Sequence, residues 1–271
     1  MRRACLLWPV LLIGSALAAL ADARMTVLVD VLRLPEAAQI LSDEGVTQAG
    51  EINEDMLDGQ GGAGFQLQVE RIYDPALMVE LVRKELEAGL DPEEREAVIA
   101  FYGTALGEKV IQLENSARQA IQDPDVEAAA RERFRLLRDS GDVRLGHITR
   151  YVDNGDMISR NVASAINSNY QFLRGLVEGG AMELSEEEML ADAARDLDES
   201  TEDTTEWLFG FLLLAYHPLE EAELDAYVAF SDSAAGQALN AALFNGFAKA
   251  YEDISYALGR AVALNMTAQE L

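Results

Sequence analysis

No histidine, serine or glycine-rich segment of this sequence stands in a known catalytic arrangement. The two histidines, His147 and His217, have no partner at the spacing of a metal site, and no His-Glu-x-x-His motif occurs. The sequence also lacks the Gly-x-Ser-x-Gly motif of a nucleophilic serine. The glycine-rich residues 59–64 lack the following lysine of a phosphate-binding loop, so we interpret them as a linker. We therefore predict no catalytic residue and no cofactor, and we place both histidines at the surface or at helix ends.

Carboxylates are the reactive groups in greatest supply, with 48 aspartate and glutamate residues. The residues from Asp196 to Ser200 resemble the start of a calcium loop, but Thr201 and Trp207 stand where such a loop has glycine and glutamate. We expect a solvated acidic segment here, with a weak surface site for divalent cations as the alternative, and we predict no metal centre. Two carboxylates about 5 to 9.5 Å apart can hydrolyse a glycan. A carboxylate-dependent hydrolase acting on envelope polymers is therefore the alternative function.

Residues 159–174 favour binding over catalysis. They are nearly uncharged in a highly charged chain, and one side of the helix that they would form carries two arginines with a hydroxyl and amides between them. These side chains can receive a carboxylate or a sugar. They can also form a polar network between helices, which is the interpretation we favour. The candidate binding residues on this side are Arg160, Ser164, Asn167, Gln171 and Arg174.

A second segment, from Trp207 to Tyr216, is apolar on every face of a helix and too short to span a bilayer. Such a helix normally lies at the centre of a core, and we expect that here. The alternative is a partly exposed face for a partner protein or for a second copy of the chain. Trp207 and Phe211, with Phe209, would then be the anchors of that face.

The N-terminus has the organisation of a secretory signal peptide. Arg2 and Arg3 precede an apolar run from Cys5 to Leu20, and the small residues that follow allow cleavage near residue 21 or 23. Because Cys5 is the only cysteine, removal of residues 1–23 excludes disulfides, thiol nucleophiles and cysteine-ligated zinc. We expect a periplasmic or secreted protein with no membrane span after cleavage.

The overall charge excludes one class of partner. The formal net charge is −27 for 271 residues, which repels nucleic acid and anionic membranes. Apolar residues make up 49% of the chain, enough for a substantial core. We therefore expect a folded acidic protein that does not bind nucleic acid.

Apolar residues recur at helical spacing along most of the chain, and no segment alternates convincingly as a strand. Asp91-Pro92 and Ser185 mark helix starts. We predict an all-α fold of about eight helices, with a first half at residues 24–142 and a second half at 143–271. A long helix near residues 143–176 would connect the halves. One buried stripe consists of Leu106, Val110, Leu113, Ala117 and Ile121.

Two stretches that lie 129 positions apart repeat one pattern. Residues 90–101 read LDPEEREAVIAF and residues 219–230 read LEEAELDAYVAF, and both begin with acids that suit a helix N-terminus. A hydroxyl that can cap the next helix follows, and then a glycine, which costs roughly 1 kcal/mol relative to alanine inside a helix. We therefore expect close backbone packing at each corner, and a bundle built from two related helix–corner–helix repeats at 90–121 and 219–251. The motif residues are Phe101, Thr104, Gly107, Phe230, Ser233 and Gly236.

This pattern resembles the bacterial domain-of-unknown-function family 2059, in which a leucine and an acidic pair precede Phe-Tyr, Ser-Pro and a glycine. LDPEEREAVIAFYGTALGEK and LEEAELDAYVAFSDSAAGQA both fit, giving two copies. Ala105 and Ala234 replace the usual proline, and Ser231 replaces the tyrosine. The resemblance implies an exported α-helical protein. It implies no activity, because no catalytic residues are established for the family.

Taken together, these features favour a non-enzymatic protein of the cell envelope. The leading hypothesis is a binding or protein-interaction module whose partner is an envelope protein or a small ligand, with a homodimer as a further alternative. An exposed apolar or amide-lined groove would support binding. A concave site with a carboxylate of raised pKa would support the hydrolase.

Overall fold

The computed structural model describes residues 22–269, which are all-α as the sequence predicts. Helical residues 22–31 precede twelve further helices, and no strand occurs in the described range. The helices are α2 (Leu34–Leu57), α3 (Gly62–Ile72), α4 (Pro75–Gly89), α5 (Pro92–Tyr102), α6 (Ala105–Ala120), α7 (Pro124–Leu137), α8 (Val143–Asn154), α9 (Met157–Glu178), α10 (Glu186–Ala193), α11 (Leu197–Ala215), α12 (Glu221–Ser231) and α13 (Ala234–Gln269).

Local chemistry sets many of the helix starts. At α5 the Asp91 carboxylate accepts hydrogen bonds from the backbone N–H groups of Glu93 and Glu94, both at 2.8 Å. The Glu94 carboxylate accepts in return from the Asp91 N–H at 3.0 Å, and proline occupies the first helical position. Ser185 and Glu188 form the same reciprocal cap at α10. Such caps allow several short helices to follow one another, which is why the described residues contain more helices than the eight expected.

The single long helix expected near residues 143–176 is wrong. α8 ends at Asn154 and α9 begins at Met157, because Asp156 adopts a left-handed conformation with φ 49°. The Asn240 side chain of α13 donates to the Gly155 carbonyl oxygen at 3.0 Å and fixes this corner against α13. The sequence carried one local sign of this break, the dipeptide Asn154-Gly155, which is typical of turns.

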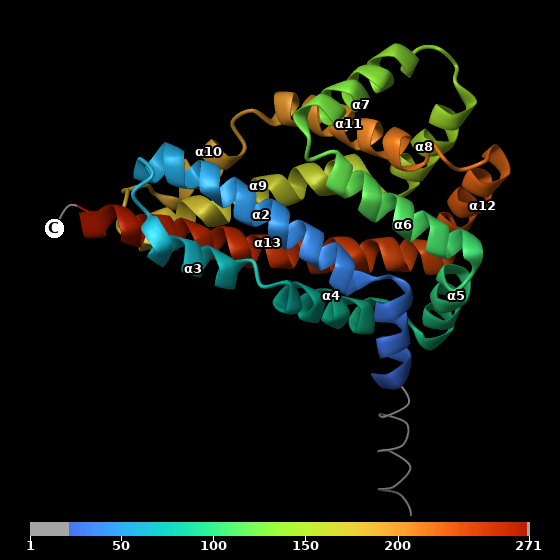
Figure 1. Ribbon diagram of the computed structural model, residues 1–271, viewed down its shortest axis with the longest axis horizontal. Coiled ribbons are helices and arrows are strands. Elements are labelled where there is room, and N and C mark those ends of the chain that lie inside the picture. The colour runs from blue at the N-terminus through green and yellow to red at the C-terminus, as the bar shows by residue number, and fades with distance from the viewer. Residues whose placement is uncertain (1–21, 270–271) are drawn as a thin grey trace, which may run out of the picture.

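The longest helix, α13, runs along the length of the molecule and organises the rest (Figure 1). α9 lies beside it, and α3 and α4 follow its other side. α2 crosses above α13, while α7 and α11 form a separate layer with α6 and α8 close by (Figure 1).

Glycines bring α9 and α13 unusually close together. A Cβ atom added at Gly175 would lie 2.4 Å from the carbonyl oxygen of Tyr256. A Cβ atom at Gly259 would lie 2.2 Å from the carbonyl oxygen of Phe172. Real Cβ atoms do not approach backbone so closely, so this crossing requires glycine on both helices.

The corners between α5 and α6 and between α12 and α13 have the same hydrogen bonds. The Thr104 hydroxyl accepts from the Gly107 N–H at 3.1 Å, and the Ser233 hydroxyl accepts from the Gly236 N–H at 3.2 Å. A Cβ atom at Gly107 would lie 2.4 Å from the Phe101 carbonyl oxygen, and one at Gly236 would meet the matching carbonyl oxygen at 2.3 Å. The backbone of each corner therefore packs directly against its glycine.

The phenylalanines of the two corners lie on one another. The rings of Phe101 and Phe230 are stacked with their centroids 3.9 Å apart and their planes 5° from parallel. Tyr102 meets Phe230 edge to face, and Phe101 also stacks near Tyr227. Stretches far apart in the sequence thus meet through their aromatic rings.

Buried apolar side chains form two core clusters. One surrounds α5, α6, α8, α11, α12 and the beginning of α13, and the other surrounds α2, α3, α10 and the end of α13. Each cluster contains residues from both sides of position 143, for example Val82 with Leu212, and Phe65 with Leu258. The division of the chain into halves at residue 143 stays a prediction.

The apolar segment 207–216 belongs to α11 and packs into the first of these clusters. Trp207, Phe211 and Leu214 are half-buried and the other seven residues are buried, so no residue of this segment is exposed. Within residues 22–269 we find no helix that is long and apolar enough to cross a membrane. Residues 1–21 of the predicted signal peptide lie outside the described residues.

Candidate functional site

A cleft with a volume of about 480 Å³ lies where α2, α6, α9, α11 and α13 meet. We call it the central cleft. It is lined by Leu41, Glu44, Gly45, Gln48, Tyr73, Arg118, Asn161, Ser164, Ala165, Ser168, Asp203, Thr204, Trp207, Tyr251, Ile254 and Ser255. Pockets of 300 to 1,000 Å³ with apolar walls and a few polar groups are typical of small-molecule sites.

An ion pair between α2 and α6 forms one wall of the cleft. Arg118 donates two hydrogen bonds to Glu44, from Nε to Oε2 at 2.9 Å and from Nη2 to Oε1 at 2.8 Å. The two side chains are only 26% and 22% exposed. The Arg118 guanidinium also lies 4.9 Å from the ring centre of Trp207, close enough for a cation–π contact. This planar, paired arrangement holds the arginine in one orientation.

The two predicted aromatic anchors lie together on α11, but only one reaches the cleft. Trp207 lines the cleft and stacks on Phe211, with ring centroids 5.4 Å apart and planes 5° from parallel. Phe211 is half-buried and does not line the cleft. Its contact with the indole helps to fix where Trp207 lies.

Of the predicted polar stripe on α9, Ser164 alone lines the cleft. Arg160 is half-buried, with its guanidinium 5.7 Å from the Phe244 ring centre. Arg174 is exposed and pairs with Glu178 of its own helix at 2.8 Å. The remaining two members lie outside the lining, with one exposed and one half-buried: Asn167 and Gln171.

The face of α9 that lines the cleft is rotated by about one residue from the predicted stripe. It consists of Asn161, Ser164, Ala165 and Ser168. Residues spaced three and four positions apart lie on one face of a helix, so this face can be recognised in the sequence. The sequence analysis missed this face because the predicted stripe was chosen to include Arg160 and Arg174. In the structure Arg160 contacts Phe244 and Arg174 contacts Glu178.

Two tyrosines supply neutral hydroxyl groups to the cleft. Burial raises the pKa of Tyr73 to about 12, and burial raises the pKa of Tyr251 to about 12 as well. Both phenols therefore keep their protons at neutral pH. Gly45 makes room for one of them, because a Cβ atom there would lie 2.0 Å from the Tyr73 ring.

The charged groups of the cleft are already compensated. Glu44 is paired with Arg118, and Asp203 accepts from Arg131 Nη1 at 2.9 Å. The remaining polar groups of the lining are hydroxyls and amides. The arrangement can hydrogen-bond a ligand at many points without supplying an unpaired charge.

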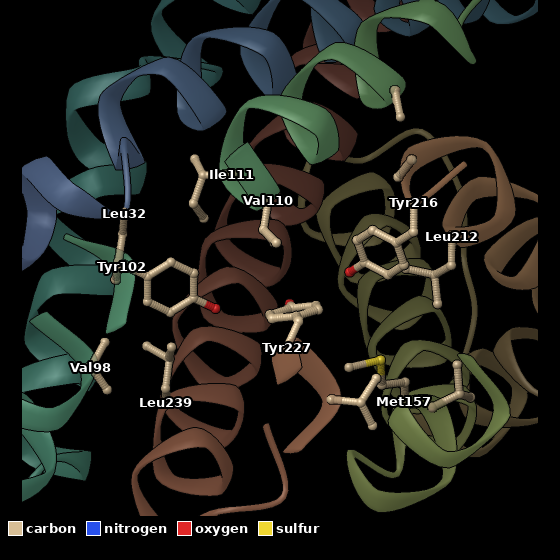
Figure 2. Close-up of a cluster of buried hydrophobic side chains, with 14 of the residues drawn as sticks. Leu32, Val98, Tyr102, Val110, Ile111, Met157, Leu212, Tyr216, Tyr227 and Leu239 are labelled. Carbon is tan, nitrogen blue, oxygen red and sulfur yellow. The ribbon is translucent and has the colours of Figure 1, made fainter. Parts of the chain in front are cut away.

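A second polar cluster, the tyrosine cluster, lies nearby and is closed. It consists of Glu114 of α6 with Tyr102, Tyr151, Tyr216 and Tyr227. Tyr216 and Tyr227 donate to Glu114 Oε1 at 2.6 and 3.1 Å, and the Tyr151 and Tyr227 hydroxyls are 2.9 Å apart. Figure 2 shows the hydroxyls of Tyr102 and Tyr216 turned toward Tyr227.

Burial raises the pKa of Glu114, although the hydrogen bonds from the two tyrosines act in the opposite direction. The residue as a whole is half-buried, but its carboxyl group is surrounded by protein. The sequence contained a signal for it, because Glu114 stands in the apolar stripe between Val110 and Ala117. A cavity of about 40 Å³ adjoins Tyr102, Tyr151 and Tyr227, and it has room for water and not for a substrate.

The histidines take no part in either cluster. His217 is exposed in the turn after α11, and His147 of α8 lies 3.5 Å from Asp225. No group of three or more histidine, cysteine, aspartate or glutamate side chains within residues 22–269 is arranged to hold a metal ion.

Comparison with known proteins gives one match. Neither the curated proteins nor the solved structures contain a significant match to this chain. The family model described as "Uncharacterized protein conserved in bacteria (DUF2059)" matches residues 77–135, which run from α4 to α7. This confirms the predicted resemblance for the first stretch, which carries Phe101, Thr104 and Gly107, and the match does not extend to residues 219–251. Over residues 77–135, the chain is thus similar to a family of uncharacterised bacterial proteins.

Proposed function

We propose that this chain is an exported, non-enzymatic binding protein of the cell envelope. Its central cleft binds an uncharged small molecule rich in hydroxyl or amide groups. The observation that carries this proposal is the lining of the cleft, where one ion pair, an indole and neutral hydroxyls surround about 480 Å³. Specificity in such sites comes from a few polar groups placed on rigid elements.

The chemistry of the lining favours a neutral ligand. Arg118 has donors beyond the two that it gives to Glu44, so the pair can bind a hydroxyl or a carbonyl group without being broken. Ser164, Ser168 and Ser255 add hydroxyls from two helices. Arg118, the cation of the cleft, is already paired with Glu44, so the lining offers an anion no free counter-charge.

Export through a signal peptide is part of the same proposal. Met25 and Leu28 are fully buried, so the fold needs the chain from about residue 25 onward. Cleavage near residue 21 or 23 leaves both residues in place, which supports a mature protein that begins there. We place the mature protein in the periplasm or outside the cell.

We also propose that the two corners are copies of one helix–corner–helix unit. Their matching hydrogen bonds and the stacked Phe101 and Phe230 support this origin. A homodimer would need a face other than residues 207–216, because all ten of these are buried or half-buried in one copy.

The hydrolase alternative has one observation in its favour, the raised pKa of Glu114. A general acid must also reach its substrate. Glu114 is hydrogen-bonded by two tyrosines, and the adjoining cavity of about 40 Å³ cannot admit a sugar ring. The geometry therefore supports binding better than hydrolysis.

The first test is to purify the mature chain gently from its own envelope and to compare its native and denatured masses. A mass excess that is lost on denaturation supports a bound companion. A bare monomer argues against a tightly held ligand and leaves the titration below as the test of weaker binding.

Trp207 provides a direct signal for that titration. The sequence contains two tryptophans, and Trp8 lies in the predicted signal peptide, so Trp207 is the single tryptophan of the mature chain. We expect its fluorescence to change when N-acetylated disaccharides or uncharged tripeptides fill the cleft. The substitution Ser164→Leu, which places an apolar side chain in the cleft, should weaken the response at least tenfold.

The matched control is Asn167→Leu, which adds a similar side chain to the exposed face of α9. It should leave the response unchanged. Equal responses from both variants, or none from the unmodified chain with any probe, would contradict the proposal. Circular dichroism on each variant separates a lost site from a lost fold.

A further inference from the structure

A second hollow, of about 450 Å³, lies between α4 and α13 at the end of α3. We call it the α4–α13 hollow. The two helices run side by side in Figure 1, with α3 continuing along α13. Its lining consists of Arg71, Ile72, Asp74, Leu77, Met78, Glu80, Leu81, Lys84, Ala250, Asp253, Ile254 and Ala257. The α4–α13 hollow and the central cleft share one lining residue, Ile254.

The walls of this hollow are aliphatic. Ala250 and Ala257 of α13 are short, so they leave space opposite the longer side chains of α4. Leu77 is 53% exposed, and Leu81 is half-buried one helical turn later. A ligand in the hollow would cover both side chains. Covering apolar surface of this kind is favourable by roughly 25 cal/mol per Å². The hollow therefore suits an alkyl chain.

The rim of the hollow is charged, and most of its charges are already engaged. Glu80 pairs with Lys84 at 2.8 Å, and Asp253 pairs with Lys249 at 2.6 Å. The Asp74 carboxylate accepts from the Ala76 backbone N–H at 2.9 Å, as a helix cap.

Arg71, on the last turn of α3, differs from these residues. It is exposed at the rim, and none of the described residues forms an ion pair with it. The rim therefore offers one uncommitted cation beside an aliphatic hollow. That combination complements a molecule with an alkyl chain and an anionic head.

We propose that the α4–α13 hollow binds a single-chain amphiphile with a carboxylate head, the chemistry of a fatty acid. The alkyl chain lies along Leu77 and Leu81 of α4 and against Ala257 of α13. The carboxylate accepts hydrogen bonds from the guanidinium of Arg71. This site is separate from the proposed function, because the ligand classes differ and Trp207 does not line this hollow.

The test is calorimetric titration of the whole mature chain with decanoate below its micelle concentration. Decanol and decyltrimethylammonium serve as probes with the same chain and a neutral or cationic head. We expect decanoate to bind at one site per chain, and to bind at least fivefold more tightly than decanol. The cationic probe should bind most weakly of the three.

Two pairs of variants locate the site. Arg71→Gln should weaken decanoate binding about fivefold and should leave decanol binding unchanged, whereas Arg133→Gln removes an exposed arginine from α7 and should change neither. Ala257→Leu fills the hollow and should weaken both probes at least tenfold. Ala88→Leu adds the same bulk at an exposed position of α4 and should weaken neither.

Several results would overturn the proposal. Binding of decanoate that is unaffected by Arg71→Gln, or that is no tighter than decanol, would remove the role of the arginine. Binding unaffected by Ala257→Leu would place the amphiphile elsewhere, and absence of decanoate binding would reject the site itself. Because Arg71 is exposed, its variant should fold, which keeps the test valid even if Ala257→Leu disturbs packing.

Discussion

Two carboxylates lie on or against α6, and their negative charges are compensated in different ways. Glu44 of α2 lies at the central cleft, where Arg118 of α6 neutralises it through two hydrogen bonds. Glu114 lies one turn earlier on α6 and receives hydrogen bonds only from tyrosine hydroxyls. Burial raises the pKa of Glu114, and among the described residues no arginine or lysine forms an ion pair with it.

The difference shows that a carboxyl group of raised pKa and a cleft open to ligands occur at different places in this molecule. Glu114, whose carboxyl pKa is raised, is closed off by Tyr216 and Tyr227. The open cleft has the opposite character, since its charges are paired and its other polar groups are neutral. A hydrolase needs both properties at one place. Their separation supports the proposed binding function.

The largest effect should come from Glu114→Leu. This change leaves the Tyr216 hydroxyl without its acceptor and leaves the Tyr227 hydroxyl with Tyr151 alone, and both tyrosines are almost completely buried. A buried hydroxyl left unsatisfied costs about 1 to 3 kcal/mol, so we expect a loss of about 3 kcal/mol in the free energy of unfolding. Urea denaturation measures it.

The control for this variant is Glu108→Leu, at an exposed position of the same helix. Its contact with Arg33 is an exposed ion pair, which contributes little to stability. We expect a change below about 1 kcal/mol. If both variants lose the same stability, the tyrosine cluster does not depend on Glu114.

A smaller effect is expected from Arg118→Leu on the open side of α6. It leaves Glu44 without a counter-charge and removes the cation from the Trp207 ring. Breaking a fully buried ion pair costs about 3 to 5 kcal/mol, and because this pair is partly exposed we expect about 2 kcal/mol. Urea denaturation followed by Trp207 fluorescence measures both stability and the change around the indole.

Arg133→Leu removes an exposed arginine of α7 and is the matched control. Its stability and its tryptophan spectrum should match those of the unmodified chain. A normal spectrum in Arg118→Leu would mean that the arginine does not lie over the indole in solution.

The sequence predicted the parts of this structure that depend on near neighbours. The caps at Asp91 and Ser185 join residues two or three positions apart, so their chemistry is visible in a short stretch. Helical periodicity likewise predicts which face of α6 is buried. The break at Asp156 was missed although Asn154-Gly155 is a typical turn dipeptide. The hydrogen bond from Asn240 of α13 to Gly155, which holds this corner, joins distant residues and is not visible locally.

The candidate site was harder to predict, because it joins distant parts of the chain. Glu44 and Arg118 are 74 positions apart, and Tyr216 reaches Glu114 across 102 positions. Ser164 and Trp207 were candidate binding residues, although a polar network and a core position were the favoured interpretations, and both line the cleft. Which side of α9 faces that cleft depends on how α9 crosses α13, and no local pattern specifies this crossing.

The smallest and most specific effect should come from Glu114→Gln. The glutamine carbonyl can accept the same hydrogen bonds from Tyr216 and Tyr227, so this variant keeps the cluster but loses the titrating group. Because the folded-state pKa of Glu114 is raised, the folded protein binds more protons than the unfolded chain between the unfolded and folded pKa values. Stability from this residue is therefore fully present below about pH 4.3, the usual glutamate value, and is lost as pH rises through the folded pKa.

Relative to the unmodified chain, Glu114→Gln should therefore gain stability as the pH rises from about 4 to 7. Each unit of raised pKa corresponds to about 1.4 kcal/mol, and urea denaturation at several pH values measures the gain. The surrounding tyrosines do not titrate in this window, because burial also raises the pKa values of Tyr102, Tyr151, Tyr216 and Tyr227. A stability difference that stays constant across the window would mean that Glu114 is as ionised in the folded protein as in the unfolded chain. In that case the contrast between the closed cluster and the open cleft would fail, and Glu114 would become a solvated carboxylate available to a substrate.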